Sequence, residues 1–304
     1  GLVHPWRHRL LLHAADCVSY ITPALAVFVP PGVPSLLLRP AVDESFFQPS
    51  TPDPKLRQRL GIAPSTALLV YPGGVNPINQ TEVRDLYTAV ARLNALGHPA
   101  ALLRTGKNPP WFERSLSADE RRHAHYLGFV PRLSIPGLLA AADLLVQPGR
   151  PGPFNDYRLP SKLAEFLASG RPVILPPCNV AAELVDDRHA IFLRTGDSEE
   201  ITARCAELLG DPVRRARLGI EARRIARHLF DLSTQACLLA AACHERLASS
   251  PRVNWTALPP QGLDERCLFP DAPSSAELAA ALVWAGHLPA TPPPPSWWRR
   301  LWSR

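Results

Sequence analysis

Apolar runs that suit buried strands alternate regularly with segments of helical spacing from about residue 60 to residue 232. The first run, residues 67–71, is continuously apolar, as in a parallel strand that is covered on both faces. Residues 81–96 then repeat apolar side chains at helical spacing, and Gly97 ends the pattern. This alternation predicts an α/β fold with a Rossmann-like, doubly wound parallel sheet. Ligands of such sheets bind beyond the carboxyl ends of the strands, so the loops there hold the candidate site.

The remaining predicted strands and helices continue this alternation. The sequence predicts further strands at residues 100–105, 126–130, 143–147, 173–175 and 190–193. It predicts helices at residues 55–60, 109–125, 135–142, 161–170, 180–186, 198–209, 212–229 and 233–247. Two turns, Pro72-Gly73-Gly74 and Gly106-Lys107-Asn108, follow predicted strands, where absent side chains let the backbone approach a ligand closely.

One stretch, residues 148–176, joins a Gly- and Pro-rich loop, a helix that begins at Pro160 or Ser161, and a buried strand. The first N–H groups of that helix have no partner within it and carry a partial positive charge. They therefore suit an anionic group such as a phosphate. Glu165 lies one turn into the helix, on the face that Ser161 begins.

Two segments carry a resemblance to a known family. PSKLAEFLASGRPVI, from Pro160, resembles the donor-site segment of retaining, family-4 glycosyltransferases of the GT-B fold. YLGFVPRLSIPGLLAAADLLVQP, from Tyr126, resembles the strand, turn, helix and strand that precede that segment in the family. The resemblance implies that the helix binds the diphosphate of a nucleotide sugar and that Glu165 binds the ribose, since a carboxylate can accept both hydroxyls.

The other donor-site residues are predicted from this resemblance together with the chemistry of their side chains. Ser161 and Lys162 are expected to bind the diphosphate, and Arg158 is a further cation in the same loop. Arg104 and Lys107 could supply the charge of an Arg and a Lys that family members commonly carry after the first turn. The backbone of Phe129 and Val130 is either a contact for the base or part of the core. The full predicted donor set is Gly73, Gly74, Arg104, Lys107, Phe129, Val130, Arg158, Leu159, Pro160, Ser161, Lys162 and Glu165.

The chain departs from the family at the donor sugar. The family often places an acidic residue eight positions before the ribose-binding Glu, and Tyr157 stands there in this sequence. Asp156 and Asn155 are the nearest replacements, so Asn155, Asp156 and Tyr157 are the candidate catalytic residues. Nucleotide binding is consequently a firmer prediction than turnover.

The sequence predicts three regions. Residues 40–47 resemble the segment that leaves the first domain of these enzymes, so residues 1–59 are interpreted as a remnant of an N-terminal acceptor domain with its linker; an ordinary surface strand and loop is the alternative. Residues 60–248 form the nucleotide-sugar domain with its closing helices. Residues 249–304 are a Pro-rich extension with one short helix at residues 274–286. The chain has no Met, even at position 1, which led us to expect a fragment or a processed product.

Charge and composition bear on the partners. The net charge of +6 allows anionic ligands or an acidic membrane surface, and no apolar run is long enough to span a bilayer. The end of the chain mixes Trp with Arg, as interfacial membrane segments do; a tail that packs on the domain or stays disordered is the alternative. The residues concerned are Trp297, Trp298, Arg299, Arg300 and Trp302. We expect a cytoplasmic protein, or one at the inner face of the membrane, without nucleic-acid partners.

The six cysteines show no CxxC and no regular spacing. They indicate reduced, packing thiols rather than disulfides, and Cys243-His244 is adjacent rather than spaced for a shared metal ion. No metal and no cofactor is expected. The predicted reaction is transfer of a hexose from a nucleotide-diphosphate sugar to a carbohydrate or lipid-linked acceptor, with retention, in polysaccharide or glycoconjugate synthesis. A nucleotide-binding module without turnover and another GT-B enzyme, such as a sugar-nucleotide epimerase, are the alternatives.

Overall fold

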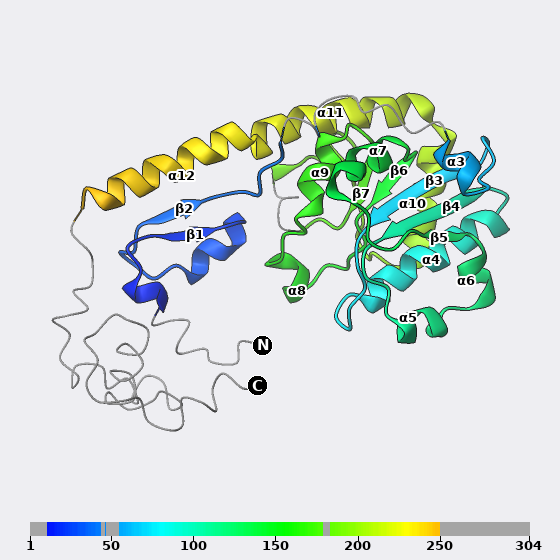
Figure 1. Ribbon diagram of the computed structural model, residues 1–304, viewed down its shortest axis with the longest axis horizontal. Helices are drawn as coiled ribbons and strands as arrows, with labels where there is room; N and C mark the ends of the chain where they lie inside the picture. The colour runs from blue at the N-terminus through cyan, green and yellow to red at the C-terminus, as the bar shows by residue number, and fades with distance from the viewer. Residues whose placement is uncertain (1–10, 44–45, 47–54, 179–182, 250–304) are drawn as a thin grey trace, which may run out of the picture. The chain divides into compact units, whose positions relative to one another are not determined.

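Residues 11–43, 46, 55–178 and 183–249 are described by the computed structural model of the chain (Figure 1). The chain divides into two compact units. The larger holds residues 20–26 and 37–239, and it contains the predicted α/β domain. The described part of the smaller unit is residues 11–19, 27–36 and 240–249.

The larger unit is built on a parallel sheet of six strands in the order β5-β4-β3-β6-β7-β8. These are β3 (Ala67–Pro72), β4 (Ala100–Thr105), β5 (Ala124–Tyr126), β6 (Leu144–Val146), β7 (Val173–Leu175) and β8 (Ile191–Phe192). The chain adds strands in one direction from β3 to β5, then returns to place β6 on the other side of β3. This reversal makes the edge beyond β3 and β6 a topological switch point, and it confirms the doubly wound sheet.

Helices connect the strands and pack with one another. They are α3 (Leu56–Arg59), α4 (Gln80–Ala95), α5 (Pro110–Ser115), α6 (Ala118–Arg122), the 3-10 turn η2 (Arg132–Ser134), α7 (Ile135–Ala140), α8 (Pro153–Asp156), α9 (Lys162–Ala168), α10 (Ser198–Gly210), α11 (Pro212–Phe230) and α12 (Leu232–Leu247). α4 packs with α6 and α10, and α9 packs with α11, which Figure 1 shows running across it. The middles of β3, β4, β6 and β7 are buried, so the core lies along these four strands of the sheet.

Segment 37–46 joins this core, although the sequence placed it in the preceding region. Val42 and Phe46 are 1% and 4% exposed and belong to the main hydrophobic cluster. The backbone N–H of Val42 donates to the carbonyl of Phe230 at the end of α11, at 2.9 Å. The compact unit therefore begins earlier in the chain than the predicted boundary at residue 60.

A separate two-stranded sheet pairs β1 (Val18–Tyr20) with β2 (Ser35–Leu37), and the 3-10 turn η1 (Pro23–Phe28) lies between these strands in the sequence. The predicted tail helix and the Trp and Arg residues of 297–302 lie outside the described residues, as do residues 180–182 of the predicted helix 180–186; residues 184–186 are described and are not helical. Within the described ranges, no helix is both long and apolar enough to cross a bilayer.

Two predicted elements differ in extent. The third strand stops at Tyr126 instead of reaching Val130, because Gly128 adopts a left-handed φ of 69° that a strand cannot continue through. The polar helix predicted over residues 109–125 is two short helices, and Ser117 begins the second with a reciprocal capping box to Glu120.

Candidate functional site

The loops that follow β3, β4 and β5 are tied together by backbone hydrogen bonds. The N–H of Val75 donates to the carbonyl of Lys107, and the N–H of Gly106 donates to the carbonyl of Gly128, each at 2.8 Å. Gly106 has a φ of 90°, and a Cβ there would lie 2.8 Å from the N of Gly74. Glycine at this position lets two strand-end loops touch through their backbones, so the rim of the sheet is rigid.

Arg104 fixes the turn after β3 from inside the protein. Its side chain is 0% exposed, and its guanidinium donates to the carbonyl of Gly73 at 2.9 Å and to the hydroxyl of Tyr87 at 2.9 Å. The guanidinium also lies within 6.0 Å of the centres of three aromatic rings, those of Tyr87, Phe112 and Tyr126. We had expected Arg104 to contact the ligand, but its complete burial places it behind the turn. Of the two predicted cations, Lys107 alone is exposed.

Glu165 lies in the first turn of α9 and faces a cation that sequence reasoning missed. Its Oε1 accepts a hydrogen bond from Nη1 of Arg132 at 2.9 Å, and its side chain is only 17% exposed. Burial raises the pKa of Glu165, while the hydrogen bond from Arg132 opposes that shift. The guanidinium of Arg132 also lies 5.3 Å from the ring centre of Phe46. The available signal for Arg132 was its place in the loop after the third strand, where the strand-end loops converge.

Lys162 begins α9 and lies 5.2 Å from the ring centre of Tyr71, the last residue but one of β3. Burial and the charge of Arg158 lower its pKa to about 8, and Glu165 opposes the shift. Ser161 is the N-cap residue, is exposed, and makes no side-chain cap. α9 has seven residues, so its dipole is small and the positive potential here comes mainly from Lys162 and Arg158.

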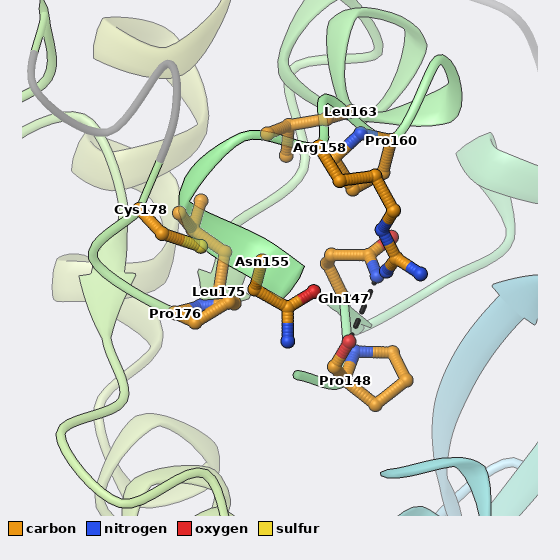
Figure 2. Close-up of a pocket in the computed structure, with 9 residues that line it drawn as sticks. All are labelled: Gln147, Pro148, Asn155, Arg158, Pro160, Leu163, Leu175, Pro176 and Cys178. Atoms are coloured by element: carbon orange, nitrogen blue, oxygen red, sulfur yellow. Dashed lines mark hydrogen bonds between the residues drawn. The ribbon is translucent and has the colours of Figure 1, made fainter. Parts of the chain in front are cut away.

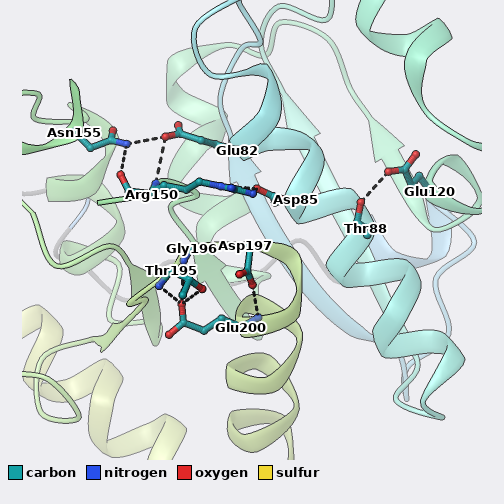
Figure 3. Close-up of polar contacts among 10 residues, drawn as sticks. All are labelled: Glu82, Asp85, Thr88, Glu120, Arg150, Asn155, Thr195, Gly196, Asp197 and Glu200. Atoms are coloured by element: carbon teal, nitrogen blue, oxygen red, sulfur yellow. Dashed lines mark hydrogen bonds and ion pairs between the residues drawn. The ribbon is translucent and has the colours of Figure 1, made fainter. Parts of the chain in front are cut away.

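The predicted sugar-side residues separate into two groups. Asn155 is 5% exposed, and its amide donates to Oε1 of Glu82 and to the carbonyl of Arg150, each at 2.7 Å (Figure 3). Its side chain therefore holds the loop through these two hydrogen bonds, and its predicted catalytic role stays a prediction. Asp156 and Tyr157 are exposed at the carboxyl end of α8.

Glu82 in α4 is a second residue that the sequence did not single out. Glu82 is 8% exposed. Its Oε1 accepts a hydrogen bond from the Asn155 amide and another, at 3.3 Å, from the backbone N–H of Arg150. The Arg150 side chain forms an ion pair with Asp85 at 2.7 Å. Oε2 of Glu82 is buried and has no hydrogen-bond partner among the described residues. Two turns of α4 thus hold the loop that follows β6, as Figure 3 shows.

The same loop is held on its other side by close backbone packing. A Cβ at Gly196 would lie 2.0 Å from the carbonyl oxygen of Gly149, so only glycine lets these two loops meet. The Gly196 loop is itself fastened, because the Glu200 carboxylate accepts from the backbone N–H groups of Thr195 and Gly196 (Figure 3). The loop between β6 and α9 is therefore held by contacts on two sides.

A small cavity of about 10 Å³ lies under this loop, with room for about one water molecule (Figure 2). Its lining residues come from β7, α8, α9 and the segments that follow β6, α8 and β7, and they are Gln147, Pro148, Asn155, Arg158, Pro160, Leu163, Leu175, Pro176 and Cys178. Oε1 of Gln147 is buried without a partner among the described residues. Burial raises the pKa of Cys178 to about 11, so its thiol stays protonated at neutral pH.

The two residues predicted to approach the base lie beyond the end of β5. Phe129 is 84% exposed, and Val130 is half-buried against the core. The five cysteines within the described residues are free thiols. No cluster of His, Cys, Asp and Glu within those residues could hold a metal ion.

The chain is similar to a family model and to a curated protein. Residues 66–211 match the family model described as "Glycosyl transferases group 1". A GDP-mannose-dependent monoacylated alpha-(1-6)-phosphatidylinositol monomannoside mannosyltransferase of Corynebacterium glutamicum is 29% identical over 189 residues, which cover 60% of this chain and 49% of that protein. The chain thus spans about half the length of the curated relative that it matches.

Solved structures share the fold. Anabaena HepE, in complex with UDP and glucose, aligns with a TM-score of 0.64 at 20% identity, over 77% of this chain and 64% of that one. WaaG, a glycosyltransferase involved in lipopolysaccharide biosynthesis, aligns with a TM-score of 0.59 at 21% identity, over 74% of this chain and 61% of that one. The α/β unit is consequently the Rossmann-like half of a GT-B-type fold.

Proposed function

Residues 66–211 match the family model of the group 1 glycosyltransferases. We propose on this basis that the protein binds a nucleotide-diphosphate sugar and transfers its hexose to an acceptor with retention of configuration. The observation that carries the proposal is the placement of Lys162 and Glu165 one turn apart on α9, beside the switch point between β3 and β6. A cation and a carboxylate at that spacing match a diphosphate and the ribose next to it.

Each residue of the donor site then has a specific role in binding the nucleotide sugar. Glu165, held by Arg132, accepts hydrogen bonds from the ribose hydroxyls. Lys162, Arg158 and the N–H groups at Ser161 stabilise the diphosphate, and the Gly73-Gly74 backbone allows its close approach. Phe129 and Val130 offer their backbone to the base, and exposed Lys107 adds positive potential at the rim.

The reaction breaks the bond between the anomeric carbon and the diphosphate oxygen. Negative charge develops on the departing diphosphate, where the preformed cations stabilise it. The acceptor oxygen bonds to the anomeric carbon from the same face, and its proton passes to the leaving phosphate oxygen. We propose that this chemistry uses no metal ion and no cofactor.

A carbohydrate or lipid-linked acceptor is supported by the mannosyltransferase relative, whose name specifies a phosphatidylinositol mannoside. A place in polysaccharide or glycoconjugate synthesis fits both kinds of acceptor. We propose a cytoplasmic protein that works at the inner membrane face, with Trp297, Trp298, Trp302, Arg299 and Arg300 as a further contact.

A nucleotide screen tests the proposal. The melting temperature of the 304-residue protein would be measured with UDP, GDP and ADP and with their sugar conjugates. A bound nucleotide at about 100 times its dissociation constant stabilises the folded state by about 2.7 kcal/mol, so the matching base should raise the melting temperature by several degrees. No shift with any of them would contradict donor binding.

A second candidate, donor binding without turnover, is favoured by the sugar side of the site. Tyr157 occupies the position where the family often has an acid, and Asn155 is turned toward Glu82. An assay of sugar transfer, with a labelled nucleotide sugar that carries the base identified in the screen, would distinguish the transferase from the binding module. Product formation supports the transferase, whereas tight donor binding without product or hydrolysis supports the binding module.

A further inference from the structure

The outer face of α11 carries a stripe in which arginines alternate with aliphatic side chains. Val213 and Ile220 are 78% and 69% exposed, and Arg217, Arg224 and Arg227 are exposed along the same helix. With about 100° between successive residues, these five positions fall within one narrow face. Cations and aliphatic groups on one face are typical of helices that lie on lipid headgroups.

Beside this stripe, α11 and the end of α9 enclose a groove of about 400 Å³. Its lining residues are Gly170, Gly219, Ile220, Arg223, Arg224 and Arg227. A Cβ at Gly219 would lie 2.2 Å from the carbonyl oxygen of Gly170, so glycine allows the two segments to approach closely there. Among the described residues, the groove is lined by three guanidinium groups and by no carboxylate.

The arginines of α11 differ in how closely they pair with carboxylates. In the first half of the helix, Arg214 and Arg217 pair with Asp187 at 2.6 and 3.3 Å. In the groove, Nη2 of Arg223 donates to the carbonyl of Ser169 at 2.7 Å, and its Nε is buried without a partner among the described residues.

Arg224 lies 3.8 Å from Glu221, whose closer partner is Arg188 at 3.1 Å. Burial lowers the pKa of Arg223, and repulsion by the like charge of Arg227 lowers it further. A phosphate in the groove would offset that repulsion.

We propose that this surface, which we call the α11 basic face (Val213, Arg217, Ile220, Arg223, Arg224 and Arg227), docks on anionic phospholipid, with one headgroup phosphate in the groove. The groove lies at the opposite end of α9 from Lys162, so it is separate from the donor site. Among the described residues, no aromatic ring on which a base could stack lines the groove. Exposed Val213 and Ile220 lie on the same face, which favours a lipid headgroup over a nucleotide. The inference adds a contact surface to the membrane-face location proposed above, and it does not rest on the donor binding or the transfer reaction.

Vesicle co-sedimentation of the full chain tests this inference. Vesicles of phosphatidylcholine with phosphatidylglycerol would be compared with pure phosphatidylcholine, for the wild type, for R223Q/R224Q/R227Q, and for a control with the same change in charge. The control is R114Q/R121Q/R122Q, three exposed arginines on or beside α5 and α6. Each cation at an anionic surface contributes about fivefold to binding, so the groove variant should bind on the order of 100-fold more weakly while the control changes little.

Because Arg223 also holds the Ser169 carbonyl, R224Q/R227Q serves as a second variant, and melting temperatures verify that all variants are folded. Equal losses in the groove and control variants would overturn the proposal in favour of diffuse charge. Equal binding of the wild type to both vesicle types would also overturn it. A wild type that ignores vesicles but is stabilised by glycerol phosphate, through the same three arginines, would replace the lipid with a soluble phosphate.

Discussion

Lys162 is a half-buried cation whose charge is lost at a lower pH than that of an ordinary lysine. Burial and the neighbouring Arg158 lower its pKa to about 8, far below the ordinary lysine value. A diphosphate binds best to the charged amine, and the bound anion in turn raises the pKa. Nucleotide affinity is therefore linked to the protonation of this one side chain.

The affinity for a nucleoside diphosphate should fall as the pH rises above about 8, by up to tenfold per pH unit, because the free site loses its proton there. Below that pH the amine is charged and the affinity should change little from this cause. Calorimetric titration across this range measures the effect. Lys162→Arg is the control, since arginine stays charged, and a wild-type slope that persists in this variant would assign the pH dependence elsewhere.

Arg104 stabilises the turn after β3 through the hydrogen bonds that its guanidinium donates to Gly73 and Tyr87. Arg104→Leu leaves the Gly73 carbonyl and the Tyr87 hydroxyl without this donor, which should lower the free energy of unfolding by about 2–4 kcal/mol. Tyr87→Phe removes one of these groups and should cost about 1 kcal/mol. Urea denaturation compares them; equal stability of Arg104→Leu and the wild type would show that the buried guanidinium is dispensable.

At the scale of elements, the predictable part was the alternation of strand and helix. The continuous apolar runs of β3 and β4 identified those strands, and regular helical spacing identified α4. The extent of β5 was not predictable from its apolar residues, since the conformation of Gly128 ends it. The bracing of the loop after β6 by Glu82 could not be predicted either, because Glu82 and Asn155 are 73 residues apart and only the fold brings them together.

Glu82 offers a test of that bracing. Glu82→Ala removes the acceptor of the Asn155 amide and should destabilise the loop by about 1–3 kcal/mol, seen as faster hydrogen exchange at residues 150–158. Glu82→Gln keeps one oxygen for Asn155 and replaces the oxygen that has no partner, so it should exchange like the wild type. If both variants exchange equally fast, the charge of Glu82, rather than its hydrogen bond, holds the loop.

At the scale of the molecule, the α/β unit includes chain from before its first sheet strand. Val42 and Phe46 are buried in its core, and Val42 bonds to the end of α11. The sequence placed the start of the nucleotide-sugar domain at residue 60, because a short apolar segment in a polar context carries no periodicity. The predicted roles of the site residues stay predictions until ligands are titrated.

A protein of residues 60–248 should be less stable than one of residues 37–248. The shorter chain loses the burial of Val42, Phe46 and Leu56, each worth about 2 kcal/mol. Thermal unfolding of the two purified proteins measures the difference. Equal melting temperatures would show that the burial of Val42, Phe46 and Leu56 does not stabilise the domain.

The central claim is that Glu165 binds the ribose of a nucleotide-diphosphate donor. Calorimetric titration of the matching nucleoside diphosphate into the wild type, Glu165→Ala and Glu199→Ala tests it, with Glu199 as a control carboxylate whose side chain is 81% exposed on α10. Loss of hydrogen bonds to a charged group should weaken binding to Glu165→Ala on the order of 100-fold, while Glu199→Ala binds like the wild type. Equal affinity of all three folded proteins would contradict the account.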